Sequence, residues 1–131
     1  MTSPKGRTKK IAFDTSFLFA VAEKPTAWRE DILEKVGAFV PVVPRSVREE
    51  LDRLAAKGGK KGSQANLAIA LLEAGGFSVE PDGGGKPDDE LMSFALREGA
   101  GVATVDSELA KRLRASGVST VVTLRQGRVH V

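Results

Sequence analysis

Four acidic residues stand where expected strands lead into helices, a place where carboxylates can meet and bind a metal ion. Asp14 and Asp106 each follow an apolar, strand-like segment. Glu50 and Asp88 lie in expected helices that follow two other strands. Carboxylates without cysteine or histidine partners favour Mg²⁺ or Mn²⁺. The four residues therefore predict an acidic site for a divalent cation.

Helical phase separates these acids from their acidic neighbours. At about 100° per residue, Glu50 borders the apolar stripe of its helix, whereas Glu49 points nearly the opposite way. In the later helix, Asp88 falls on the apolar face, Asp89 at its edge and Glu90 toward solvent. Glu50 and Asp88 are thus predicted to be the inward members of two acidic runs.

Helix capping is the alternative explanation for three of the four acids. Asp14, Asp88 and Asp106 could each accept backbone N–H bonds at the start of a helix. Glu50, inside a helix, has no such role. Converging carboxylates repel one another unless a cation lies among them. Since divalent cations promote phosphodiester cleavage, the residues favour a metal-dependent enzyme that acts on nucleic acid.

The charge and composition narrow the class of protein. Setting the four acids aside leaves 20 basic residues against 13 acidic ones in a chain of net charge +3, and a basic body suits a polyanion. The absence of cysteine excludes disulfides and thiolate metal sites, and His130 is the only histidine. No apolar run reaches the roughly 18–20 residues of a membrane span. We expect a cytosolic protein without a membrane partner.

The order of the expected elements predicts an α/β fold. Residues 1–8 read as a flexible basic tail, and residues 9–131 as one domain. Strands are expected at residues 9–13, 38–44, 77–80, 100–105, 118–124 and 128–131, with helices between the first five. This alternation favours a mostly parallel sheet covered on both faces, with its functional crevice at the carboxyl ends of the strands.

Several local features carry expectations of their own. Thr26 is expected to be the N-cap of a helix, and Ser46 and Glu49 have the spacing of a capping box. Pro41 suggests that its strand lies at an edge or contains a bulge. Residues 57–62, "KGGKKG", predict a flexible basic loop.

Four segments in order, "IAFDTSFL", "VVPRSVREEL", "PDDELMSFALREGAGVATVDSEL" and "VVTLRQGRVHV", resemble the PIN-domain ribonucleases from about Lys10 onward. The resemblance implies a three-layer α/β/α sandwich with a central, mostly parallel sheet, and a Mg²⁺- or Mn²⁺-dependent endoribonuclease. It implies that Asp14, Asp88 and Asp106 hold metal, while Glu50 completes the site or positions the attacking water. Whether one or two metal ions take part stays open.

The same resemblance implies further residues that support the metal site. Ser16 and Thr104 match positions that help hold the first aspartate and the water at the metal, and Asp89 and Glu108 are candidate outer acids. Two positions depart from the family pattern. The family often has Asn at the position of Ser16 and at that of Val105, whose side chain cannot hydrogen-bond. We expect activity with modest metal affinity.

RNA is expected to approach over basic residues at the rim of the site. Such residues would contact phosphates without reading sequence, although a solvated charged surface explains each of them equally well. The candidates are Lys57, Lys60, Lys61, Lys111, Arg112 and Arg114.

Alternative functions stay open at this point. Within the PIN family, the chain resembles both archaeal rRNA-processing nucleases and VapC-type toxins. The first resemblance implies a ribosome-assembly partner and the second an antitoxin. Either group is consistent with a homodimer. A non-catalytic PIN-fold module that binds RNA or protein is a different class, favoured by Val105. A phosphorelay receiver domain fits poorly, because Glu80 and Arg125 stand where it needs an aspartate and a lysine.

Overall fold

The computed structural model describes residues 9–131, and the predicted tail of residues 1–8 lies outside the described residues. The helices and strands are β1 (Lys9–Phe13), α1 (Thr15–Glu23), α2 (Trp28–Val36), β2 (Phe39–Pro44), α3 (Arg45–Lys57), α4 (Gly59–Ala74), β3 (Ser78–Glu80), α5 (Pro87–Glu98), β4 (Gly101–Ala103), α6 (Ser107–Ala115), β5 (Val121–Arg125) and β6 (Arg128–His130). One or two helices lie between each strand and the next up to β5, and β6 follows β5 directly. Within the described part, no helix is long and apolar enough to cross a membrane.

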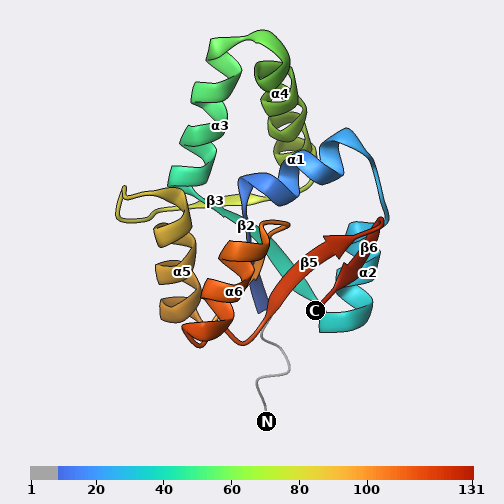
Figure 1. Cartoon of the computed structure of the whole chain (residues 1–131), viewed down its shortest axis with the longest axis vertical. Coiled ribbons are helices and arrows are strands. Elements are labelled where there is room, and N and C mark those ends of the chain that lie inside the picture. Colours follow the sequence, from blue (N-terminus) through green and yellow to red (C-terminus); the bar gives the residue numbers. More distant parts are fainter. Residues whose placement is uncertain (1–8) are drawn as a thin grey trace.

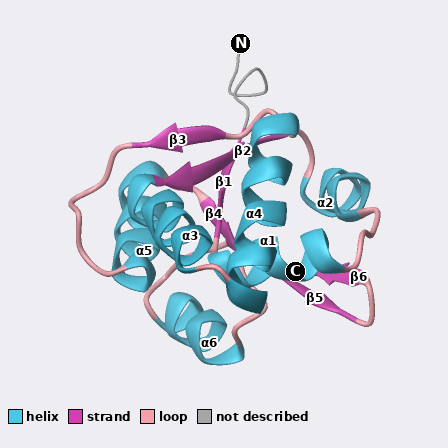
Figure 2. Ribbon diagram, turned by 90° about the horizontal axis from the view of Figure 1, so that it is seen from above, coloured by secondary structure: helices cyan, strands magenta, loops and turns pink. Residues whose placement is uncertain are grey.

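The six strands form one sheet in the order β3-β2-β1-β4-β5-β6. All neighbouring pairs are parallel except β5 and β6, which form an antiparallel hairpin. Helices α1, α2 and α4 lie on one side of the sheet, and α5 and α6 lie on the other (Figures 1 and 2). This arrangement confirms the predicted three-layer α/β/α sandwich with a mostly parallel central sheet.

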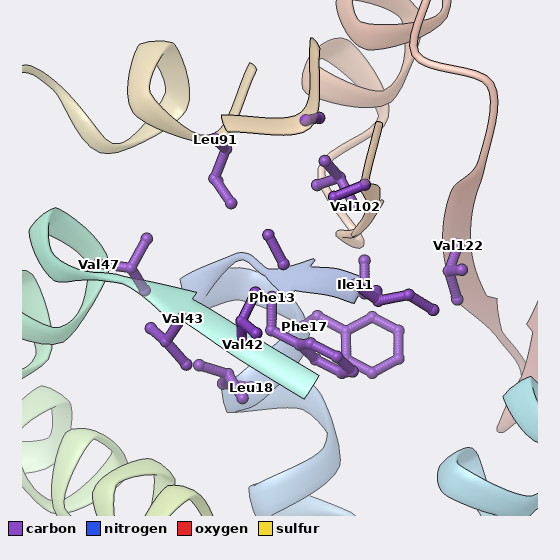
Figure 3. Packing of buried hydrophobic residues seen from close by; sticks show 14 of the residues in the cluster. Ile11, Phe13, Phe17, Leu18, Val42, Val43, Val47, Leu91, Val102 and Val122 are labelled. Atoms are coloured by element: carbon purple, nitrogen blue, oxygen red, sulfur yellow. The ribbon is translucent and has the colours of Figure 1, made fainter. Parts of the chain in front are cut away.

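The core lies on both faces of the central strands. Ile11 and Phe13 of β1, Val42 of β2 and Val102 of β4 are fully buried (Figure 3). Strands that are buried on both faces need continuous apolar sequence, which is why these segments do not alternate with polar residues. Phe13 also packs edge-on against Trp28, with ring centroids 5.3 Å apart. The core therefore fixes the ends of β1 and β4, after which two of the predicted acids follow.

The order of the strands reverses between β1 and β4. From β1 the chain passes to β2 on one side, and it later crosses back to β4 on the other side. In doubly wound sheets, ligands bind at the carboxyl ends of the strands where the order reverses in this way. The backbone N–H of Asp14 donates to the carbonyl of Ala103 at 2.9 Å and holds the two strand ends together.

Three local expectations were wrong: the strand position of Pro41, the N-cap role of Thr26 and the capping box of Ser46. Strand β2 is an interior strand and its register with β1 is unbroken at Pro41, so this residue marks neither an edge strand nor a bulge. Pairing with β3 begins only at Val42, so no β3 residue stands opposite Pro41. Helix α2 begins at Trp28 without a side-chain cap, and Thr26 is not its N-cap. Helix α3 begins directly after β2, and Ser46 makes no capping box: its backbone N–H donates to Oδ2 of Asp82, 2.9 Å away. A carboxylate from a distant loop thus supplies the cap.

The predicted basic loop of residues 57–62 is mostly helical. Helix α3 ends at Lys57 and α4 begins at Gly59, so Gly58 alone separates them. Gly58 and Gly59 have φ angles of 74° and 71°, which side chains rarely adopt, and these angles allow the tight reversal. A Cβ at Gly62 would lie 3.2 Å from the carbonyl oxygen of Leu54. The glycines therefore let two antiparallel helices approach closely.

Candidate metal and nuclease site

Asp14 stands at the end of β1 and is only 6% exposed. It occupies the N-cap position of α1, yet its side chain accepts no capping bond there. Instead Oδ2 accepts hydrogen bonds from the hydroxyls of Ser16, at 2.5 Å, and Thr104, at 2.7 Å. Both donors are neutral, so they satisfy the oxygen without cancelling a negative charge. A buried carboxylate held in this way is suited to attract a cation.

The two hydroxyls are themselves fixed by the backbone that follows β4. The N–H of Asp106 donates to Oγ1 of Thr104 at 3.0 Å, and the N–H of Val105 donates to Oγ of Ser16 at 3.1 Å. Each hydroxyl thus accepts one backbone N–H bond and donates its own hydrogen to Asp14. The apolar side chain of Val105 therefore leaves this network complete, because its backbone supplies the bond.

Asp106 acts as the N-cap of α6. Its Oδ1 accepts from the N–H groups of Glu108 and Leu109, at 3.0 and 3.1 Å. The alternative role predicted for this residue is thus observed. Both bonds use Oδ1, so capping does not occupy Oδ2.

Glu50 is half-buried on α3, and its Oε1 accepts a hydrogen bond from the hydroxyl of Thr15 at 2.7 Å. Asp88 and Asp89 lie in the first turn of α5 and both are exposed, whereas Glu90 is half-buried. The prediction that Asp88 is the inward acid of this run was therefore wrong, because the loop before α5 covers Glu90 instead. Asp89 pairs with Arg112 of α6, with Nη2 and Oδ1 2.5 Å apart. A cavity of about 400 Å³, hereafter the acidic cavity, is lined by Glu50, Lys86, Pro87, Asp88, Asp89 and Arg112.

The electrostatics connect all four predicted acids. Partial burial is the largest cause that raises the pKa of Asp88, followed by the negative charges of Asp14 and Asp106. The charge of Glu50 adds to this effect, while the Arg112 guanidinium opposes it and favours the ionised carboxyl. Asp88 therefore lies in the combined field of the other three acids, which a bound cation would relieve.

The four acids fit a divalent cation in donor type and charge. They offer carboxylate oxygens, the ligands that Mg²⁺ and Mn²⁺ prefer, and two of these oxygens, Oδ1 of Asp14 and Oδ2 of Asp106, take no part in the bonds described above. Among residues 9–131, however, no three acidic or histidine side chains are close enough to hold one metal ion. The four acids therefore fit a cation in their ligand type and in their negative electrostatic field, but not in their present spacing. To share one ion, the side chains need to move or to bind it through water.

The predicted RNA contacts fall in different places. Lys57, Lys60 and Lys61 are exposed at the junction of α3 and α4, the upper end of the molecule in Figure 1. Arg112 faces Asp89 in the acidic cavity. The structure does not gather the six residues into one surface, since Lys111 and Arg114 line another cavity on the opposite side of α6.

Sequence reasoning missed some of the residues that organise this region. Thr15 bonds to Glu50, and its place beside Asp14 was the available signal. Glu90, expected to face solvent, accepts from the N–H groups of Gly83 and Gly85, at 2.8 and 3.0 Å. Those bonds span a loop and a helix, so helical phase alone could not predict them. Glu108, a candidate outer acid, contributes its backbone N–H to the α6 cap and has an exposed side chain.

Comparisons with known proteins agree with this architecture. A family model described as "PIN like domain" matches residues 11–127. The structure of the PIN domain endonuclease Utp24 is similar, with a TM-score of 0.74 and 21% identity, covering 92% of this chain and 88% of that one. A domain of a functionally unknown protein from Methanocaldococcus jannaschii has a TM-score of 0.66 at 18% identity, covering 95% and 96%. VapBC2 from Rickettsia felis, bound to a promoter DNA fragment, has a TM-score of 0.64 at 15% identity, covering 87% and 98%. No curated protein matches the sequence.

Proposed function

Because the chain belongs to the PIN-like domain family, we propose that it is a Mg²⁺- or Mn²⁺-dependent endoribonuclease that hydrolyses RNA phosphodiester bonds. One observation carries the proposal. Asp14 is a buried carboxylate with only neutral hydrogen-bond donors, and its charge acts on Asp88 together with those of Asp106 and Glu50. Uncompensated negative charges that face one another favour a bound divalent cation.

Each acid has a stated role in this proposal. Asp14, Asp88 and Asp106 hold the cation, directly or through water. A bound Mg²⁺ or Mn²⁺ supplies Lewis-acid stabilisation of charge on the phosphoryl oxygens. Glu50 positions the attacking water and accepts its proton, and since Thr15 bonds to Oε1, we assign this task to Oε2. Ser16 and Thr104 keep Asp14 oriented.

The acidic cavity also contains groups that can receive the substrate. Lys86 and Arg112 line it beside Asp88 and Asp89, and their cationic groups suit the non-bridging oxygens of a phosphodiester. The pair of Arg112 and Asp89 is about half exposed on both sides, so its net contribution to stability is small, about 0–1 kcal/mol. Arg112 can therefore release Asp89 and bind a phosphate with little loss of folding free energy.

A cleavage assay tests the proposed activity. Labelled structured RNA is incubated with the wild type in Mn²⁺, Mg²⁺ or EDTA, beside an Asp14→Asn/Asp106→Asn variant and a Glu49→Gln control. Metal-dependent cleavage should fall at least about 100-fold in the double variant, or roughly 2.7 kcal/mol of transition-state stabilisation. The control should cleave as the wild type does. Absence of cleavage by folded wild type with either metal would instead favour a non-catalytic PIN-fold module.

The biological setting has two candidates. We propose rRNA processing with a ribosome-assembly partner, supported by the fold similarity to the endonuclease Utp24. The alternative is a VapC-type toxin, supported by the similarity to VapBC2. Induced expression of the wild type and of the Asp14→Asn variant distinguishes them: a toxin arrests growth only when its site is intact, whereas a processing nuclease does not arrest growth.

A further inference from the structure

A second cavity lies between α6 and the β5–β6 hairpin. Its volume is about 510 Å³, within the roughly 300–1,000 Å³ typical of ligand sites. Four of its lining residues carry cationic or imidazole side chains: Lys111 and Arg114 on α6, Arg125 at the end of β5, and His130 on β6. We refer to this site as the basic cavity. Sequence analysis indicated only the two residues on α6, because the hairpin contributes the others through the fold.

The cations of the basic cavity have no ion-pair partners among the described residues. No acidic side chain lines the cavity, and the α-carboxylate of Val131, the last residue, is the one anionic group that its lining residues carry. None of the ion pairs found within residues 9–131 involves Lys111, Arg114 or Arg125. By contrast, Arg112 on the opposite face of the same helix is paired with Asp89. Three cations grouped in a concave site without ion-pair partners attract an anion.

Helix α6 separates the basic cavity from the acidic cavity. Figures 1 and 2 show α6 between α5 on one side and β5 on the other. The basic cavity reaches the start of the helix, because Val105 and Ser107, which line it, flank Asp106, one of the four proposed metal-binding acids. A polyanion that reaches Asp106 can therefore continue across the start of α6 into the basic cavity.

We propose that the basic cavity binds a backbone phosphate of the RNA strand, beside the bond that is cleaved; this inference rests on the proposed nuclease function. The Lys111, Arg114 and Arg125 side chains bind the phosphate oxygens, and the hydroxyls of Ser107 and Thr123 offer further donors. A phosphate contact of this kind fixes the position of the strand and does not read its sequence. The site thus holds the substrate in register for cleavage at the acidic cavity.

Binding without cleavage tests the proposal. The probe is a short fluorescent oligoribonucleotide in EDTA, followed by anisotropy. Replacing two cations of the basic cavity, in Lys111→Gln/Arg125→Gln, should weaken binding at least about tenfold at about 0.1 M salt. The slope of log Kd against log salt should fall by about 1.4, because each single-strand phosphate that a side chain neutralises adds about 0.7 to it.

Two further variants separate a specific site from general attraction. Lys24 and Arg53 are exposed and line neither cavity, so Lys24→Gln/Arg53→Gln removes the same charge elsewhere. It should bind RNA nearly as the wild type does. The charge-retaining Lys111→Arg/Arg125→Lys variant should recover most of the lost affinity. All four replaced side chains are exposed, so these variants are expected to fold, which circular dichroism verifies.

The outcomes distinguish this inference from the proposed function. Equal weakening in the cavity variant and the Lys24/Arg53 control, or no RNA binding by the wild type, overturns the basic cavity as a phosphate site. Neither result depends on metal or catalysis. Conversely, loss of binding confined to the cavity variant, in a wild type that cleaves no RNA, supports the cavity and contradicts only the nuclease.

Discussion

The hydroxyl of Thr104 donates a 2.7 Å hydrogen bond to Oδ2 of Asp14, across 90 residues of sequence. Thr104 is fully buried and Asp14 is nearly so. The bond joins the ends of β1 and β4 where the strand order reverses. It also brings the buried carboxylate next to Asp106, whose N–H donates to the same hydroxyl. The acidic site is therefore assembled by the contact between these two strands.

Thr104→Val should destabilise the protein. It keeps the size of the side chain but leaves Asp14 with one hydroxyl donor and the N–H of Asp106 without an acceptor. Loss of a partner for a buried polar group costs about 1–3 kcal/mol, and the free energy of unfolding in urea measures it. Thr123→Val is the matched control, because Thr123 makes only a long 3.4 Å bond to a carbonyl. Equal destabilisation by the two changes would contradict the role given to Thr104.

Thr15→Val should affect the chemical step more than substrate binding. Thr15 donates a hydrogen bond to Oε1 of Glu50 and therefore orients this carboxylate. Removing such a positioning hydroxyl should lower kcat about tenfold with little change in KM. Thr15→Ser, which keeps the hydroxyl, should restore most of the rate. A rise in KM at constant kcat, or equal rates in the valine and serine variants, would show that Thr15 does not position Glu50.

Asp88→Asn should stabilise the protein in EDTA. Burial and the neighbouring acids raise the pKa of Asp88 from its ordinary value of 3.8, so the folded state disfavours the ionised carboxyl. The contribution of Asp88 to the free energy of unfolding therefore falls as pH rises from that value through the raised pKa. At neutral pH the asparagine should raise the melting temperature by roughly 1–3 °C, the scale of a weak surface electrostatic effect.

The gain from Asp88→Asn should disappear in acid, where the native carboxyl is protonated. Melting curves across the acidic range test this pH dependence. Asp89→Asn is the neighbouring control. Since Asp89 pairs with Arg112, its replacement should give no comparable gain. A stabilisation by Asp88→Asn that persists at low pH would indicate a cause other than charge repulsion.

The fold could be predicted from the sequence because the features that indicate it, apolar strand segments followed by helices, are local and recur along the chain. Apolar segments that end at Asp14 and Asp106 identified two central strands, and the carboxyl ends of parallel strands meet at one edge of the sheet. The chain's membership in the PIN-like family agrees with the resemblance carried by the four segments. The phase of Glu50 on its helix likewise indicated which face borders the core.

Features that join distant segments could not be predicted in this way. The start of α3 is capped by Asp82, 36 residues away, and nothing near Ser46 signals that partner. The basic cavity needs α6 and the β5–β6 hairpin together, so the sequence alone did not place Arg125 among the expected RNA contacts. The "KGGKKG" segment contains glycines that suggest a loop, yet packing of α3 on α4 makes most of it helical. Tertiary contacts decided each of these cases.

The most direct test of the central claim, that the four acids share a divalent cation, is a Mn²⁺ titration followed by electron paramagnetic resonance. The variants are Asp14→Asn, Glu50→Gln and the matched control Glu49→Gln, whose acid is exposed on the same helix as Glu50. We predict that the wild type and the control bind Mn²⁺ alike, and that the other two bind it at least about tenfold more weakly. Equal Mn²⁺ affinity in all four proteins, or no binding by the wild type, would contradict the shared-cation site.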